Sequence, residues 1–296
     1  MSELSDKLAQ PCRVCGHSTT ESRWKVANQT LDQCETCKFV QVRNKPDAAT
    51  IAAIYSETYF AHAKYCDPQA LHFENTRRLE LLKPYLPENA TLLDAGCSIG
   101  DFIDLAKKTY QCSGTDISEY AIKLAAQRHP ELASRLEARP LEGNMFGGQQ
   151  FDAICMWDVI EHLWDPAPVL ENLLGRLKPG GHFFISTPAI DAPIARAMGR
   201  YWAFMTPPEH LSFFTKKSFY RLFREKENTQ LVTLFRRGKW ANLGFIGYKF
   251  RRVAPQWTQN LSNIFSHRWL RHRNVYVPTR DVQYLVVRKL ITPRGG

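Results

Sequence analysis

Strand-like and helix-like segments alternate along residues 91–187, and this alternation limits the chain to few folds. Short apolar runs at 91–96, 112–118, 151–157 and 181–187 predict strands. The segments 99–110, 119–129 and 165–179 between them predict helices. Strands that alternate with helices form a parallel sheet covered on both faces. We therefore expect an α/β fold with a mostly parallel sheet, and any ligand at the carboxyl ends of its strands.

Two cysteine pairs precede this region. PCRVCG and DQCETC supply Cys12 and Cys15, then Cys34 and Cys37 after eighteen residues. This repeated C-x2-C spacing is a strong signal of a zinc site with four thiolate ligands. Some forty residues bury little core, so the metal would stabilise the fold. We expect a zinc ribbon over residues 1–45, with a structural zinc because four protein ligands leave no open position.

The segment LLDAGCSIGDF, residues 92–102, predicts a nucleotide-binding turn. The first strand ends at Asp94, and Gly96 and Gly100 follow in the turn. The second strand ends at Asp116, where an acid can accept hydrogen bonds from both hydroxyls of a ribose. The turn is neither a complete G-x-G-x-x-G, because Ser98 stands at its middle position, nor a P-loop, because no Gly-Lys-Ser/Thr follows.

Four segments in this order resemble the motifs of class I S-adenosylmethionine-dependent methyltransferases, which have a Rossmann-like sheet. They are LLDAGCSIGDF, GTDIS, FDAICMWDVIEHLWDP and LLGRLKPGGHFFISTP. The third of these, with the later PPEHLSFFT, resembles the branch of ubiquinone-pathway O-methyltransferases. The cysteine pairs are similar to those of zinc-bearing methyltransferases from bacterial sugar and polysaccharide pathways. The resemblance covers residues 70–236 and a final strand at 282–290.

The resemblance implies a role for several residues in binding S-adenosylmethionine. Asp94 and Gly96 would line the methionine part, and Gly100 would allow close packing at the helix start. Asp116 would hold the ribose, and Ile117 would flank the adenine. Trp157 and Asp158, at the end of the strand FDAICMW, would lie near the sulfonium.

Two sites could assist the loss of a proton from the methyl acceptor. In WDVIEHL, the residues Asp158, Glu161 and His162 share one face if the segment is helical. The similar E-x-x-E-H of the ubiquinone-pathway enzymes implies a divalent cation there, although these side chains could also merely organise the pocket wall. In TPPEHLSFFT, His210 follows two prolines and could act as the base, or simply pack against the neighbouring phenylalanines.

Positive charge is concentrated in the last quarter of the chain. The whole chain has a net charge of +10, whereas residues 221–296 alone hold 16 basic and 3 acidic side chains. Such a region attracts phosphates of nucleic acids, anionic lipids or small metabolites, or is a solvated surface. Aromatic residues among these cations could stack on bases or sugars, and LSNIFSHRWLRHR could lie on a membrane surface.

These observations together predict a cytoplasmic enzyme, since no apolar run of membrane-spanning length or secretory signal is recognisable. The predicted parts are the zinc module 1–45, a linker and helical lead-in 46–90, the methyltransferase domain 91–236 and 281–291, and a basic aromatic insertion 237–280. The expected acceptor is a small or glycan- or lipid-linked anionic metabolite, with sugar, nucleotide-sugar and polysaccharide precursors favoured. An RNA methyltransferase and a cofactor-binding protein without activity are the alternatives. The sequence leaves the methylated atom and the oligomeric state open.

Overall fold

The structure, a computed structural model, describes residues 10–17, 20–54, 68–224, 228–244, 246–247 and 273–291. Most of the predicted basic aromatic insertion, including LSNIFSHRWLRHR, lies outside the described residues, as do 55–67 of the lead-in. Within the described part, no helix is both long and apolar enough to cross a membrane.

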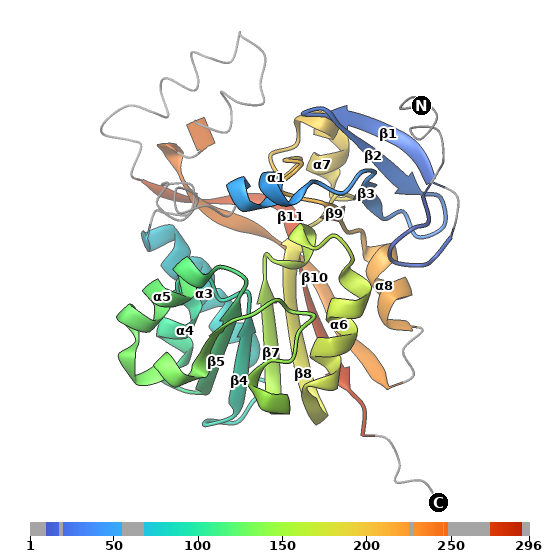
Figure 1. The fold of residues 1–296 in the computed structure, drawn as a ribbon. Coiled ribbons are helices and arrows are strands. Elements are labelled where there is room, and N and C mark those ends of the chain that lie inside the picture. The colour runs from blue at the N-terminus through green and yellow to red at the C-terminus, as the bar shows by residue number, and fades with distance from the viewer. Residues whose placement is uncertain are drawn as a thin grey trace, which may run out of the picture.

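A seven-stranded sheet forms the body of the molecule (Figure 1). Its strand order is β10-β11-β8-β7-β4-β5-β6. The strands comprise Thr91–Ala95 (β4), Gln111–Asp116 (β5), Leu136–Ala138 (β6), Phe151–Trp157 (β7), Leu177–Pro188 (β8), Thr229–Asn242 (β10) and Asn274–Lys289 (β11). The five strands from β6 to β8 are parallel, and β11 is antiparallel to both β8 and β10. The expected mostly parallel α/β sheet is therefore confirmed.

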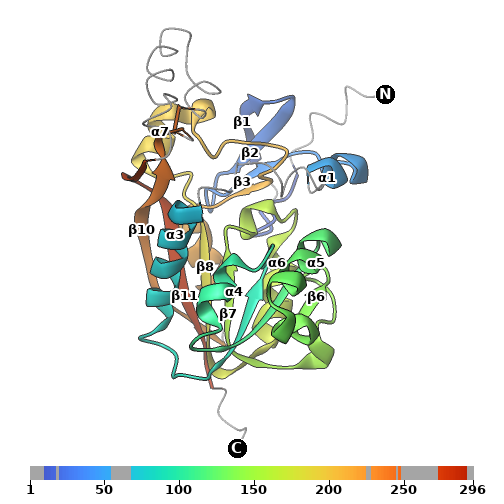
Figure 2. The ribbon, with the colours of Figure 1, turned by 90° about the vertical axis from the view of Figure 1, so that its left-hand side faces the viewer.

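Helices cover both faces of this sheet because neighbouring strand residues point in opposite directions. Leu92 and Ala153 pack on one face with α3 (Pro68–Leu82), α4 (Asp101–Ala106) and α5 (Glu119–Arg128). Leu93 and Ile154 pack on the other face with α6 (Pro166–Gly175) and α8 (Lys216–Arg224). Figures 1 and 2 show the layers from two sides. The carboxyl ends of the parallel strands are thereby held rigidly at one edge.

The cysteine-bearing segment forms a second, four-stranded sheet of order β1-β2-β3-β9. Its strands are Thr20–Val26 (β1), Gln29–Cys34 (β2), Val40–Val42 (β3) and Ser212–Phe213 (β9). Ala27 and Asn28 both have positive φ, as the tight turn between β1 and β2 requires. The fourth strand comes from the body of the chain, so the ribbon shares its sheet with the segment that follows His210.

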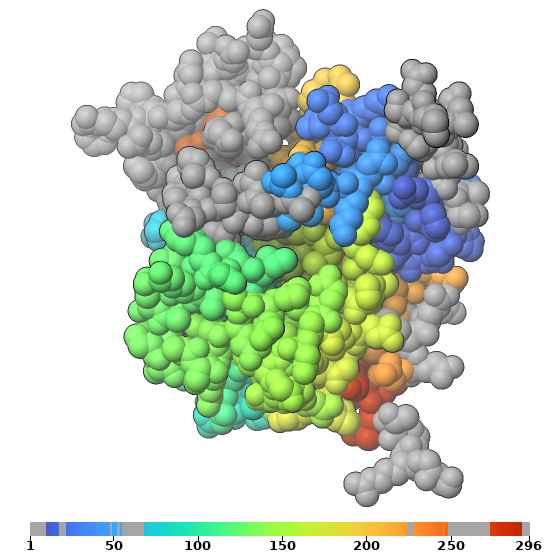
Figure 3. Space-filling view, in the orientation of Figure 1, coloured from blue at the N-terminus to red at the C-terminus, as the bar shows by residue number. Residues whose placement is uncertain are grey.

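The ribbon lies over the carboxyl ends of the parallel strands (Figure 1) and packs closely on the body (Figure 3). Cys12, Cys34 and Cys37 belong to the same buried cluster as Phe214 and the α6 residues. Two short helices, α1 (Ala48–Ile54) and α7 (Pro193–Met198), lie at this end of the molecule as well. Short 3-10 turns occur at Pro130–Arg135, Phe146–Gly148, Ile160–His162 and Gly199–Tyr201. The strands β10 and β11 extend to Asn242 and from Asn274, into the range predicted as an insertion.

Candidate functional site

The turn after β4 needs glycine at two positions. Gly96 has a φ of 86°, and a Cβ there would lie 2.4 Å from Val159 Cγ2. Gly100 has a φ of 84° at the start of α4, where a Cβ would meet the His129 ring at 3.0 Å. A side chain at either position would therefore be strained by the positive φ and would have to displace Val159 or His129. The structure places both glycines in one tight turn at the carboxyl end of β4.

Asp116 lies beside this turn, at the end of β5. Its two carboxylate oxygens accept hydrogen bonds from the backbone N–H groups of Ser98, at 3.0 Å, and Ser118, at 2.9 Å. Each oxygen retains acceptor capacity for a further donor. Ile117, the next residue, has 61% of its surface exposed. An acid next to an exposed apolar side chain suits a ribose and its attached base.

Asp94 is buried among apolar side chains at the end of β4. Only 3% of its surface is exposed, and burial raises the pKa of its carboxyl to about 7, although the nearby Arg78 charge opposes that rise. The Arg78 charge therefore compensates only part of the cost of burying this carboxylate. A cationic ligand in the turn would supply a further compensating charge.

The segment after β7 differs from the sequence expectation. Only Ile160–His162 is helical, as a single 3-10 turn, and Asp158 lies outside it with a φ of 56°. The predicted common face for Asp158, Glu161 and His162 is therefore wrong. A left-handed conformation at a non-glycine residue persists only where its surroundings hold it.

Arg78, which the motifs did not indicate, holds Asp158. Its guanidinium donates to Asp158 Oδ2 at 2.5 Å, and Ser186 Oγ donates to Oδ1 at 2.9 Å. Although burial disfavours the charged form, Arg78 and Lys239 lower the pKa of Asp158 to about 2. The guanidinium also lies 5.4 Å from the centre of the Trp157 ring. These residues form a charged corner at the carboxyl ends of β7 and β8.

Glu161, His162 and His210 form a second cluster. Their potential ligand atoms all lie within 4.8 Å of one another. The two imidazole rings meet edge to face, with centroids 4.8 Å apart. Burial raises the pKa of the Glu161 carboxyl to about 8, and the charge of Asp158 adds to the rise. Thr187 Oγ1 donates to this carboxyl at 2.8 Å.

Backbone carbonyls orient both histidines. His162 Nδ1 lies 2.8 Å from the Glu209 carbonyl, and His210 Nδ1 lies 2.8 Å from that of Phe204. A carbonyl only accepts, so Nδ1 carries the proton in each ring and Nε2 carries the lone pair. A nitrogen prepared in this way can take a proton or ligate a metal. The set that could hold a cation is therefore Glu161, His162 and His210, with His210 in place of Asp158.

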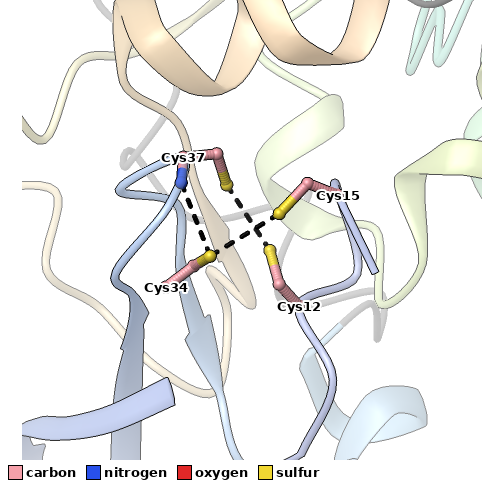
Figure 4. Close-up of side chains that lie close together, drawn as sticks. All are labelled: Cys12, Cys15, Cys34 and Cys37. Atoms are coloured by element: carbon pink, nitrogen blue, oxygen red, sulfur yellow. Dashed lines mark hydrogen bonds between the residues drawn. The ribbon is translucent and has the colours of Figure 1, made fainter. Parts of the chain in front are cut away.

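The four N-terminal cysteines point toward one another (Figure 4). The sulfurs of Cys12 and Cys37 are 3.5 Å apart, those of Cys15 and Cys34 are 3.6 Å apart, and all four thiols are free. Zn–S bonds of about 2.3 Å place neighbouring sulfurs about 3.8 Å apart in a tetrahedron. The cluster therefore fits a zinc ion with only small adjustments, as the spacing predicts.

The sequence model of the family described as "Methyltransferase domain" matches residues 60–233, which is more than half of the chain. The chain belongs to this family. The expected class of methyltransferase is thereby confirmed for the region that contains both glycines, Asp94 and Asp116.

Individual relatives match only part of this chain. The ubiquinone biosynthesis O-methyltransferase of Caulobacter vibrioides is 30% identical over 160 residues, 48% of this chain and 62% of that protein. Its counterpart from Coxiella burnetii is 32% identical over 122 residues, 40% of this chain and 52% of that protein. The chain thus spans between about half and three fifths of the length of these relatives.

Two solved structures have the same fold. The YcgJ protein from Bacillus subtilis aligns with a TM-score of 0.52 at 13% identity, covering 75% of this chain and 99% of that one. The BH2331 protein from Bacillus halodurans aligns with a TM-score of 0.51 at 15% identity, covering 72% of this chain and 98% of that one. At this identity, the likeness concerns the fold alone.

Proposed function

We propose that this member of the methyltransferase family transfers a methyl group from S-adenosylmethionine to a small acceptor. The main support for the proposal is that two groups of site residues lie at the same edge of the sheet. The turn with Gly96, Asp94 and Asp116 suits the cofactor, and the Glu161, His162 and His210 cluster suits proton removal. Both lie where open α/β sheets bind ligands.

The residues around the turn fit the cofactor. Gly96 keeps the turn tight, because a Cβ there would overlap Val159. Asp116 and Ile117 present an acceptor and an apolar surface to the nucleoside. Arg78 Nε and Trp157 Nε1 are buried donors without a partner among the described residues. We propose that these donors face the charged methionine end, and that Asp94 and Gly96 line it. Gly100 allows the close approach of the helix start.

The bound cofactor supplies an electrophilic methyl group on a sulfonium. The protein then has to align the acceptor, exclude water and accept a proton. We assign proton acceptance to His210 through Nε2, since Nδ1 is committed to the Phe204 carbonyl. Glu161 and His162 support this ring, or bind a divalent cation together with it. Two imidazoles and one carboxylate suit a transition metal rather than magnesium, which prefers oxygen ligands.

The substitution His210→Ala is expected to lower turnover by about 10²- to 10⁴-fold, the usual contribution of a general base. Affinity for S-adenosylmethionine should stay unchanged, because the ring lies outside the cofactor turn. Rates of methyl transfer and a cofactor titration on the same sample measure both. His182→Ala is the control, since His182 also packs on an aromatic ring, Tyr85, but lies earlier on β8. Undiminished turnover in His210→Ala would remove His210 as the base.

The substitution Asp94→Asn is expected to stabilise the protein at alkaline pH and weaken cofactor binding. Unfolded Asp94 releases its proton above pH 3.8, whereas the folded carboxyl holds it until about pH 7. The free energy of unfolding therefore falls as pH rises through this window, and the full penalty is present above pH 7. Asn carries no such penalty. The free energy of unfolding of the variant should therefore exceed that of the wild type at pH 8 by up to about 4 kcal/mol.

Urea unfolding of both proteins at pH 5, 6.5 and 8 measures this difference. Glu142→Gln, which replaces an exposed acid after β6, is the control. Its free energy of unfolding should change with pH as that of the wild type does. If Asp94→Asn and wild type keep a constant difference from pH 5 to pH 8, Asp94 does not titrate in this window.

The acceptor class is tested by transfer of a labelled methyl group. We propose a sugar, nucleotide-sugar or polysaccharide precursor, because the zinc ribbon stands over the acceptor side of the sheet and the chain is basic. Purified protein and labelled cofactor are incubated with small-metabolite, lipid, glycan and RNA fractions of a cell extract. Label in a metabolite or glycan fraction, absent with Asp94→Ala, supports the proposal. Label in RNA alone makes the chain an RNA methyltransferase, and cofactor binding without any transfer makes it a binding protein.

A further inference from the structure

A cavity of about 310 Å³ lies between the zinc ribbon and the segment 200–207. One wall is the end of β1 and the turn after it, with Lys25 and Ala27, and the other contains Arg200, Tyr201 and Thr206. This volume is at the lower end of the range for ligand pockets, which begins at about 300 Å³. It suits a monosaccharide-sized group rather than a whole nucleotide sugar.

The walls have the chemistry of an anion site with an aromatic platform. Lys25 and Arg200 bring a cation from each wall, and none of the described lining residues is acidic. Half of the Tyr201 surface is exposed, and the Arg200 guanidinium lies 4.8 Å from the centre of its ring. Thr206 Oγ1 is buried and has no hydrogen-bond partner among the described residues.

The cavity is built by the fold rather than by flexible surface side chains alone. Gly199 has a φ of 54°, and its Cα position faces Trp24 of β1, whose Nε1 would lie 3.8 Å from a Cβ there. This turn directs Arg200 and Tyr201 beside the hairpin. The following residue, Trp202, is anchored because its Nε1 donates to Asp281 at 2.9 Å.

The same segment leads directly to His210. The backbone N–H groups of Glu209 and His210 both donate to the Thr206 carbonyl, at 2.9 and 3.1 Å. The cavity wall and the proposed base therefore belong to one closed turn. His210 itself does not line the cavity, so the observed link between the cavity and the proposed base is this turn.

We propose that this cavity binds the sugar-phosphate part of the methyl acceptor, with the phosphate between Lys25 and Arg200 and the sugar ring against Tyr201. The inference rests on the proposed function, because it treats the zinc ribbon as one wall of the acceptor site. It gives the ribbon a role in specificity, and it restricts the acceptor to phosphorylated sugars and their derivatives.

The test is calorimetric titration of the full-length, zinc-loaded protein, saturated with S-adenosylhomocysteine, with glucose 1-phosphate. Glucose and inorganic phosphate are titrated as comparisons. The wild type should bind glucose 1-phosphate more than about tenfold tighter than either. Lys25→Gln and Arg200→Gln should each weaken it by about tenfold, and Tyr201→Ala should weaken it as well. Lys123→Gln, an exposed lysine on α5, is the matched control.

The outcomes separate this inference from the proposed function. A wild type that binds S-adenosylhomocysteine but not glucose 1-phosphate overturns the cavity assignment alone. Equal binding of phosphate and glucose 1-phosphate overturns the sugar part, and unchanged affinity in Lys25→Gln and Arg200→Gln overturns the location. Failure to bind S-adenosylhomocysteine overturns the proposed function itself.

Discussion

Removing zinc from the ribbon is expected to lower methyl transfer by about tenfold to a hundredfold while cofactor affinity changes little. In our proposal the ribbon needs the metal for its stability, because it has little core of its own. The cofactor turn, by contrast, is built from β4 and β5 in the middle of the large sheet. Loss of zinc should therefore affect the acceptor side of the site selectively.

The expected coupling runs through hydrogen bonds between the ribbon and the histidine cluster. Arg13, between Cys12 and Cys15, donates to the carbonyl oxygens of Val42 at 2.9 Å and Leu211 at 3.4 Å. Val42 N donates to Leu211 O, and Leu211 N donates to Glu161 O at 2.8 Å. Leu211 is the neighbour of His210. If the ribbon lost its structure, His210 would lose the support of these hydrogen bonds. A displacement of about 1 Å at a reacting group can lower the rate by about a hundredfold.

The comparison of Cys37→Ser with Cys112→Ser tests the coupling. Both side chains are 1% exposed, so the packing cost is similar, but only Cys37 belongs to the cluster. Cys37→Ser should lose zinc and turnover and keep its affinity for S-adenosylhomocysteine, whereas Cys112→Ser should retain one zinc per chain. Full turnover in a zinc-free protein would show that the ribbon does not position His210.

Features that depend on short stretches of sequence were predictable. The zinc ligands follow from two C-x2-C pairs, and the cofactor turn follows from two glycines that need positive φ between a strand and a helix. The alternation of strands and helices is likewise local. It predicted the mostly parallel sheet and the edge of that sheet at which the site lies. Zinc binding and the roles of the individual site residues stay predictions.

Features that depend on distant contacts were not predictable. A helical reading of WDVIEHL was reasonable from its composition, but Asp158 is held outside a helix by Arg78, eighty residues earlier, and by Ser186. His210 joins Glu161 through the backbone bond between Leu211 and Glu161, fifty residues apart. No local pattern specifies such pairs.

The Arg78 position did leave a weak signal in the sequence. The buried residues of α3 are Ala70, Glu74, Asn75, Arg78 and Leu82, which recur at about the helical period. Three of them are polar, so hydrophobic patterning assigns this face to solvent. The zinc module predicted over residues 1–45 likewise does not include β9, which pairs with β3 in the structure. Strand pairing across about 170 residues has no sequence signature.

The substitution Arg78→Met is expected to destabilise the protein by about 2–3 kcal/mol and to weaken S-adenosylmethionine binding by about tenfold or more. Methionine keeps the length of the side chain but leaves the Asp158 carboxylate without its hydrogen-bonded counter-charge, so that only the Lys239 charge remains. The cost falls below that of a fully buried charge because 31% of the Asp158 side chain is accessible to water. Binding weakens because the guanidinium is the cation that faces the methionine end of the cofactor in our proposal.

The double variant Arg78→Met with Asp158→Asn separates these two effects. Removing both charges relieves the unpaired carboxylate, so stability should return most of the way to the wild type, as replacement of whole buried ion pairs often does. Cofactor affinity should stay low, because no guanidinium has been restored.

Lys83→Met is the control, since its pair with Glu80 is exposed and contributes less than about 1 kcal/mol. Urea unfolding and cofactor titration give both readouts. A double variant as unstable as Arg78→Met would mean that Arg78 acts through packing rather than charge, and wild-type affinity in either variant would place Arg78 outside the cofactor site.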